Sequence, residues 1–169
     1  QFGNIVDVAG GRGHLLAAIL KANPRTQGIL FDMPHVTDGA RRHLEAEGVA
    51  SRAQVISGDF LQSVPGGGDA YVLKHIIHDW DDARAETILR SCRQVVPKNG
   101  KLLVLEMVIP PGNDPFFGKL LDLEMLVMTP GGRERTESEY RSLIARAGFK
   151  LTGIIPTRSP VSLLEASPA

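Results

Sequence analysis

The chain has 169 residues, 43% of them hydrophobic, and its 19 basic side chains balance its 19 acidic ones. This length suits one domain with a sizeable core, and a neutral chain without a basic block favours small-molecule partners over nucleic acid or a membrane surface. Cys92 is the one cysteine, and no signal peptide or bilayer-spanning run is visible, so we expect a cytoplasmic protein. Residues 1–4 lead into a strand without an initiator Met, which suggests a fragment.

Apolar runs of strand length alternate with helical patterns in the first hundred residues. Strands are expected at residues 5–8, 28–31, 54–57, 70–74 and 102–108. Helices are expected behind the glycines at 10–13, from Pro34 through Val49, and from near Asp81 through Val96, whereas a loop at 65–68 joins the third and fourth strands. Cys92 falls on the inward stripe of the third helix, which favours a core position.

The pattern changes after the prolines at residues 110–115. A helix is expected at 119–128, and another begins at the capping box of Thr136 and Glu139 and ends at Gly148. Two late strands, 149–155 and 161–166, are joined by five residues, too few for a parallel crossover. The sequence therefore predicts an α/β fold with a mostly parallel seven-stranded sheet, a C-terminal antiparallel hairpin and helices on both faces.

The first glycine turn favours a nucleotide-like cofactor. Gly10, Gly11 and Gly13 allow backbone amides to approach a ligand closely, and the helix behind them offers a partly positive N-terminus. The dinucleotide fingerprint needs Gly or Ala where Leu16 stands, which counts against NAD. The same glycines also suit a plain strand-to-helix turn.

Two aspartates follow the next two strands. Asp32 comes roughly 20 residues after the glycines, the spacing at which an acid accepts hydrogen bonds from ribose hydroxyls. The alternative for Asp32 is an N-cap of the next helix. Asp59 is placed to accept a bond from an adenine amino group while Phe60 packs on the ring, although a simple turn aspartate explains Asp59 nearly as well.

His78 is the first candidate for a catalytic base, because its unperturbed pKa of about 6.5 lies near neutrality and it follows a strand end. Glu106 and the loop residue Glu134 are candidates to share its edge of the sheet. A carboxylate on one ring nitrogen fixes the tautomer and stabilises the imidazolium. The alternative for Glu134 is a surface salt bridge with Arg133 or Arg135.

The other chemistry-bearing side chains favour structural roles. His75, His78 and Asp79 are a weak metal set, because residues three apart at a strand end are expected to point to different faces. We therefore expect no metal, and His75 as packing or helix entry. Trp80 is expected to pack on the sheet. On balance we expect three methionines to be core residues, namely Met107, Met125 and Met128. Met125 and Met128 also lie near the proposed site, where they would contact a flat acceptor.

Six segments occur together in order: VDVAGGRG, FDMPHV, GDF, LKHIIHDW, LLVLE and PGGRERT. They resemble the catalytic domain of plant and bacterial small-molecule O-methyltransferases, which include caffeate, flavonoid and acetylserotonin enzymes. The resemblance covers nearly the whole chain. It implies a Rossmann-like fold that binds S-adenosyl-L-methionine and moves its methyl group to a hydroxyl of a small aromatic or polyketide-like molecule, with S-adenosyl-L-homocysteine as product.

The resemblance also implies roles by position. His78 matches the general base, and Glu106 and Glu134 match the acids that brace it. The cofactor would be held by Gly10, Gly11, Gly13, Asp32, Met33, Asp59, Phe60 and Lys74. The acceptor would meet Asp79, Met125 and Met128. Members of this family carry an N-terminal winged-helix-like domain that makes the homodimer and closes part of the acceptor pocket; nothing here matches it, so residues 1–169 are expected to be the catalytic domain alone.

Three positions depart from the family pattern, namely Ala9 in place of the first glycine, Phe60 where plant enzymes often carry Met, and His75 in place of an aromatic residue. These departures bear on the choice of acceptor more than on cofactor binding. Two other functions remain open from the sequence. One is a non-catalytic protein that binds S-adenosylmethionine, and the other, disfavoured by Leu16, is a nicotinamide-dependent oxidoreductase.

Overall fold

The structure is a computed structural model and describes residues 2–169. Its strands are β1 (Asn4–Val8), β2 (Gln27–Asp32), β3 (Ala53–Ser57), β4 (Ala70–Lys74), β5 (Lys101–Ile109), β6 (Arg135–Thr136), β7 (Phe149–Pro156) and β8 (Val161–Pro168). Its helices are α1 (His14–Ala22), α2 (Pro34–Ala46), α3 (Asp82–Val95), α4 (Phe117–Met128) and α5 (Glu137–Arg146), with short 3-10 helices η1 (Ala50–Arg52) and η2 (Ile77–Asp79).

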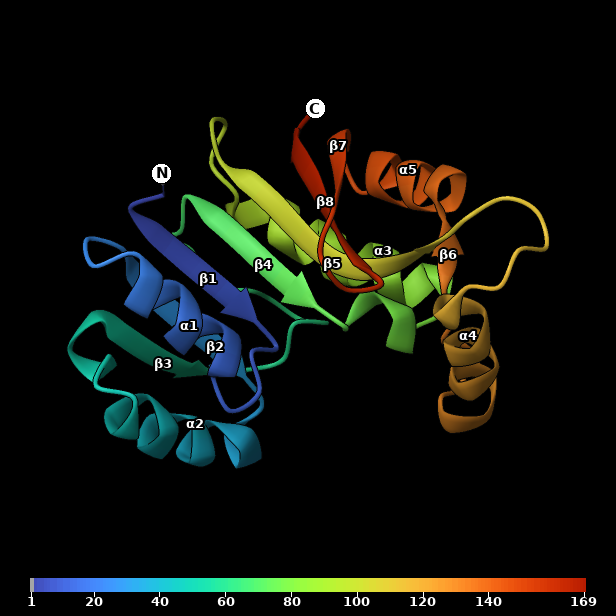
Figure 1. Cartoon of the computed structure of the whole chain (residues 1–169). Helices are drawn as coiled ribbons and strands as arrows, with labels where there is room; N and C mark the ends of the chain where they lie inside the picture. Colours follow the sequence, from blue (N-terminus) through green and yellow to red (C-terminus); the bar gives the residue numbers. More distant parts are fainter. Residues whose placement is uncertain (1) are drawn as a thin grey trace.

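The strands form one sheet in the order β3-β2-β1-β4-β5-β8-β7 within residues 2–169 (Figure 1). Strands β1 to β5 pair in parallel, whereas β8 runs antiparallel to both β5 and β7. The predicted mostly parallel sheet with a C-terminal hairpin is confirmed. The two-residue strand β6, which pairs with the last residues of β5, was expected to be loop.

Alternate side chains of each inner strand enter opposite helix layers, as the two-residue period of a strand requires. Ile5 of β1 packs with Leu15 and Ile19 of α1. Its neighbour Val6 belongs to the larger core, which includes side chains of α3 and α5. Figure 1 shows α1 and α2 on one side of the sheet and α3 and α5 on the other. Cys92 lies in this larger core, fully buried as predicted.

Helix α4 is packed differently. Its Met125 is buried, but Leu123 is 60% exposed and Val127 83% exposed. Figure 1 shows α4 beyond β6, to the side of the sheet. The core position expected for Met128 is wrong, because this side chain is 71% exposed on the outer face of α4, whereas Met107 and Met125 are buried as predicted.

Helix boundaries differ slightly from the prediction. Helix α4 begins two residues before the expected Lys119, and α2 ends at Ala46, so that the buried Val49 lies beyond it. The capping box of Thr136 and Glu139 is present, since each side chain bonds the other residue's backbone N–H. None of the helices in the described residues is long and apolar enough to cross a membrane.

Candidate active site

The glycine turn follows β1 and lies against the end of β2. Ala9 N donates to Phe31 O at 2.7 Å, and Gly13 N closes the turn on Gly10 O at 2.9 Å. A Cβ on Gly10 would lie 2.7 Å from Asp7 Oδ2, so any larger residue there would displace the buried side chain of Asp7. Ala9 adopts φ 56°, a left-handed conformation that an alanine holds under strain.

A cavity of about 230 Å³ opens beside this turn. Its lining joins the turn to the carboxyl end of β4 and consists of Asp7, Ala9, Gly10, Gly11, Arg12, His14, Leu15 and Lys74. Lys74 is exposed at its rim. The structure therefore brings Lys74 to the glycine turn, as the cofactor hypothesis requires. It is an open pocket lined by an acid, a lysine and the backbone of the glycine turn.

Asp32 ties the end of β2 to the glycine turn. Its Oδ2 accepts from Gly11 N at 2.8 Å, and its Oδ1 accepts from Met33 N at 2.6 Å. Met33, not Asp32, is the N-cap residue of α2, so the N-cap interpretation of Asp32 is wrong. A carboxylate has about four acceptor sites, which leaves two for a ligand such as a ribose diol.

Asp7 was not singled out from the sequence, although it lies in the cavity wall. It is 2% exposed, and its Oδ2 has no hydrogen-bond partner among the described residues. Burial, helped by the negative charge of Asp32 and opposed by Lys74, raises the pKa of Asp7 to about 7. A single acid inside the apolar run of residues 5–8 was the signal in the sequence.

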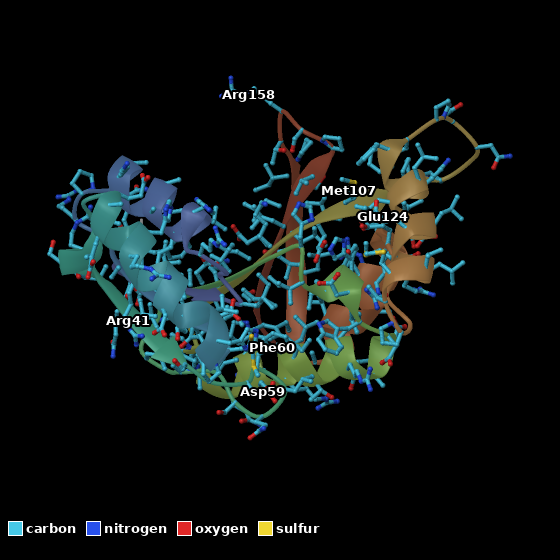
Figure 2. The ribbon with its side chains drawn as sticks, turned by 90° about the horizontal axis from the view of Figure 1, so that it is seen from below. Arg41, Asp59, Phe60, Met107, Glu124 and Arg158 are labelled. Carbon is cyan, nitrogen blue, oxygen red and sulfur yellow. The ribbon has the colours of Figure 1, made fainter. Side chains whose placement is uncertain are left out.

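Asp59 and Phe60 lie on the loop after β3, away from α4 with its Glu124 (Figure 2). Asp59 Oδ1 accepts from Leu61 N at 2.9 Å, so this carboxylate does stabilise its own turn. Phe60 packs edge-on against Trp80, with ring centroids 5.9 Å apart. Trp80 also packs against the main core, as predicted. Neither Asp59 nor Phe60 is part of the cavity wall beside the glycine turn.

Glu106, in the second half of β5, holds the backbone of the segment that carries His78. Its Oε1 accepts from the backbone N–H groups of Ile76 at 3.0 Å, Ile77 at 2.8 Å and His78 at 3.4 Å. The side chain of Glu106 is completely buried. Three donors on one oxygen fix where η2 begins, so Glu106 positions His78 through the main chain as well as through its charge.

Glu134 contacts the imidazole of His78 directly. His78 Nδ1 donates to Glu134 Oε1 at 2.7 Å, while Glu106 Oε2 lies 3.6 Å from the same nitrogen. Since a carboxylate only accepts, this bond places the proton on Nδ1 and leaves Nε2 with its lone pair. Asp79 Oδ1 lies 3.5 Å from Nε2.

The buried cluster shifts the titration of its members. Burial pulls the pKa of His78 down, but the hydrogen bond with Glu134 and the charges of Glu106, Glu134 and Asp79 outweigh this, so the pKa of His78 stands above its ordinary value. Burial raises the pKa of Glu106 to about 7, although His78 opposes the shift. Burial also raises the pKa of Asp79. His78 is thus a stronger base than a free imidazole.

The loop before β6 brings Glu134 to this cluster. Arg133 N donates to His78 O at 2.8 Å, and Glu134 N donates to Asp122 Oδ1 at 2.8 Å. A Cβ on Gly132 would lie 2.5 Å from His78 O, so this close approach of two backbones requires glycine. The loop is fixed against η2 on one side and α4 on the other.

The arginines next to Glu134 bind elsewhere, so the salt-bridge interpretation of Glu134 is wrong. Arg133 pairs with Glu139. Arg135, fully buried, donates to Asp82 Oδ1 at 2.8 Å and to the carbonyl oxygens of Ile77 at 3.0 Å and Trp80 at 2.8 Å. This guanidinium joins β6, η2 and α3. Sequence reasoning missed it, because a charged residue in a loop gives no sign of burial.

His75 and His78 converge, contrary to the prediction that they point to different faces. His75 has φ 54°, and η2 turns the chain directly after it, so a strand period no longer applies. The two ring centroids lie 5.3 Å apart, and His75 Nδ1 lies 3.8 Å from Glu106 Oε2. Burial, together with the charges of Lys74 and His78, lowers the pKa of His75 to about 4. His75 N donates to Leu105 O at 3.1 Å and so extends the pairing of β4 with β5.

The profile of the O-methyltransferase domain family matches residues 1–150. The phenazine O-methyltransferase PhzM of Lysobacter antibioticus is 48% identical over 167 residues, which are 99% of this chain and 49% of that protein. The O-demethylpuromycin-O-methyltransferase of Streptomyces alboniger is 46% identical over 173 residues, 99% of this chain and 46% of that protein.

Among solved structures, the O-methyltransferase NcsB1 from neocarzinostatin biosynthesis, in complex with S-adenosylmethionine and 2-hydroxy-5-methyl naphthoic acid, matches with a TM-score of 0.90. It is 37% identical, and the match covers 99% of this chain and 49% of that one. The chain thus spans about half the length of the relatives it matches. With the family profile matching most of its length, the chain belongs to the family of O-methyltransferase domains.

Proposed function

We propose that this domain binds S-adenosylmethionine beside the glycine turn and supports transfer of the methyl group to a hydroxyl of a small aromatic acceptor, with His78 as general base. The observation that carries the proposal is the orientation of the imidazole. Its Nδ1 is bonded to Glu134 at 2.7 Å, and its Nε2 keeps a lone pair for a proton. Family membership supports the reaction class.

The residues around the cavity fit the cofactor. The unpartnered Oδ2 of Asp7 and the ammonium group of Lys74 suit the α-ammonium and α-carboxylate of its amino-acid end. Asp32, at the next strand end, keeps acceptor sites for the ribose hydroxyls, while Met33, Asp59 and Phe60 are proposed to contact the rest of the nucleoside. Gly10, Gly11 and Gly13 let it approach the backbone closely.

In the proposed mechanism His78 accepts the hydroxyl proton at Nε2, and Glu134 stabilises the imidazolium that results. Glu106 stabilises the same charge from 3.6 Å and keeps η2 in place. Bound S-adenosylmethionine supplies an activated methyl group on a sulfonium. The protein mainly positions the partners, and positioning of this kind is worth about 7–11 kcal/mol, with general-base help adding about 10²- to 10⁴-fold.

The acceptor side is proposed to be completed by protein outside this chain. Helix α4 leaves an apolar face uncovered, and its inner side carries the buried Met125 near the loop of Glu134. A second domain that covers this face and contributes to a homodimer accounts for the exposed Leu123, Leu126 and Met128. Asp79, Met125 and Met128 are then proposed to meet the acceptor.

The test is the variant His78→Ala in the full-length protein, with His35→Ala, an exposed histidine of α2, as matched control. We expect calorimetric affinity for S-adenosylhomocysteine to stay the same and turnover with phenolic acceptors to fall by about 10²- to 10⁴-fold. An unchanged methylation rate contradicts the role of His78. Binding without methyl transfer to any acceptor by the unmodified protein favours a non-catalytic binding protein, and stabilisation by NADH favours an oxidoreductase.

A further inference from the structure

His75, His78 and Glu106 place three metal-ligating groups around one point. Their ligand atoms all lie within 4.8 Å of one another. Glu106 Oε2 lies 3.8 Å from His75 Nδ1 and 3.6 Å from His78 Nδ1. Two ligands of a tetrahedral ion at bond lengths of about 2.0–2.1 Å lie roughly 3.4 Å apart, so small side-chain movements close this triangle around an ion.

A separate observation points to a cation at this place. Glu106 Oε2 and Glu134 Oε2 are both buried and have no hydrogen-bond partner among residues 2–169. Glu106 is completely buried and Glu134 is 5% exposed. Unpartnered buried carboxylate oxygens are uncommon because they give up hydration without replacement, and an ion is one of the partners that restores it.

We infer that this cluster is a binding site for a divalent transition metal of the zinc or cobalt type, held by His75, His78 and Glu106. A set of two imidazoles and a carboxylate suits zinc or cobalt better than calcium or magnesium, which prefer oxygen ligands. The two positive charges are balanced by Glu106 and Glu134. The side chain of His75, 30% exposed, gives the ion a route from solvent into the cluster.

A metal ion would bind His78 Nδ1, the nitrogen that donates to Glu134 in the structure. The ion binds the lone pair of His78 Nδ1 in the other neutral tautomer, so the ring proton moves by way of solvent from Nδ1 to Nε2, and Glu134 becomes a neighbour of the ion in place of a hydrogen-bond partner. The imidazole then loses the basicity that the proposed function needs. The regulatory consequence, inhibition of methyl transfer by zinc, rests on that proposed function, whereas the binding site itself does not.

His75 makes the proposal specific to this chain and testable. The binding experiment titrates Co²⁺ into the chain and follows its visible ligand-field absorption, which needs no turnover. We expect one equivalent of Co²⁺ to develop a four-coordinate spectrum and Zn²⁺ to abolish it. The variant His75→Asn suits the positive φ at this position and removes a good ligand, so it is expected to weaken binding by at least about ten-fold.

His35→Ala is the matched control and is expected to bind as the unmodified chain does. His75→Phe is a second variant, and the thermal melting of both variants without metal establishes that they are folded. Absence of the spectrum in the unmodified chain, which would leave an ordered water as partner of the carboxylates, overturns the site. A spectrum unchanged in both folded His75 variants overturns it too.

A second readout concerns inhibition and separates this inference from the proposed function. In the full-length protein, the Zn²⁺ concentration that halves methyl transfer is expected to rise at least about ten-fold in His75→Asn, with each variant compared with its own metal-free rate. Bound Co²⁺ without inhibition overturns the regulatory consequence. The general-base role of His78 is judged independently by the metal-free rate of His78→Ala.

Discussion

The two halves of the candidate site are built in different ways. Around the glycine turn, the polar contacts join residues close in the chain, such as Gly11 and Asp32, which are 21 positions apart. The base receives its partners from farther along, since Glu106 lies 28 positions and Glu134 56 positions after His78. The first half is a local motif on adjacent strand ends, whereas the second exists only when distant segments have packed.

The two halves of the site also differ in their exposure to solvent. The cavity beside the glycine turn is open, with Lys74 exposed at its edge, whereas Glu106 and Glu134 are sealed from water. Charges screened by water interact weakly, and buried ones couple strongly. Errors of placement should therefore cost little on the open side and much on the buried side.

Among the changes that test this comparison, the largest effect is expected from Gly132→Ala. The added Cβ would lie 2.2 Å from Thr129 Oγ1 and 2.5 Å from His78 O, so the loop must move and carry Glu134 away from the imidazole. A displacement of about 1 Å lowers turnover by about 10²-fold. Gly39→Ala, at an unobstructed site within α2, is the control, and is expected to raise stability by about 0.5–1 kcal/mol. Equal effects of both substitutions on turnover would contradict the difference between the two halves.

A smaller loss is expected from Glu134→Gln, which keeps the shape of the side chain and removes its charge. Turnover should fall by about 10- to 100-fold, as for other groups that orient a histidine. The charge of Glu134 helps to hold the pKa of His78 above its ordinary value, so the substitution should lower that pKa. The increase of kcat/KM with rising pH should therefore occur at lower pH than in the unmodified protein. The surface variant Glu137→Gln should leave the profile in place. An unchanged pH dependence of kcat/KM in Glu134→Gln would show that a group other than His78 controls it.

The smallest effect concerns the open half and Asp7. Its folded pKa of about 7 means that the carboxyl is largely protonated below that pH, whereas a ligand ammonium favours the ionised form. Affinity for S-adenosylhomocysteine should therefore rise by about ten-fold from about pH 6 to about pH 8, with proton release on binding. Calorimetry in two buffers of different ionisation enthalpy measures both quantities. Asp7→Asn should flatten the dependence, and an unchanged slope in that variant would rule out Asp7.

The same contrast explains what could be predicted from the sequence. The strand ends, the glycine turn and Asp32 follow from hydrophobic periods and turn residues within one βαβ unit. The parallel sheet and the candidate residues at its carboxyl edge were therefore predictable. The positions of His75 and Arg135 were not. The positive φ of His75 overrides the strand period, and the burial of Arg135 depends on carbonyl groups of η2 that no local pattern announces.

Glu134 shows the boundary between the two kinds of inference. Neighbouring arginines favour a surface salt bridge, and only the resemblance to a family assigned the acid to His78. The structure supplies the physical reason, since Arg133 and Arg135 each bind an acid on another segment. Pairing with Glu134 fails here because Arg133 pairs with Glu139 at the start of α5 and Arg135 with Asp82 of α3.

Strand β6 is two residues long, and it gives the protein an order of assembly. A chain emerging from the ribosome completes β1 to β5 before Glu134 and Arg135 are synthesised. At that moment His78 and Glu106 are already part of the chain, but Glu134, which bonds the imidazole, has not been added. The segment from Glu134 onward thus supplies the acid that, in the proposed function, orients the base.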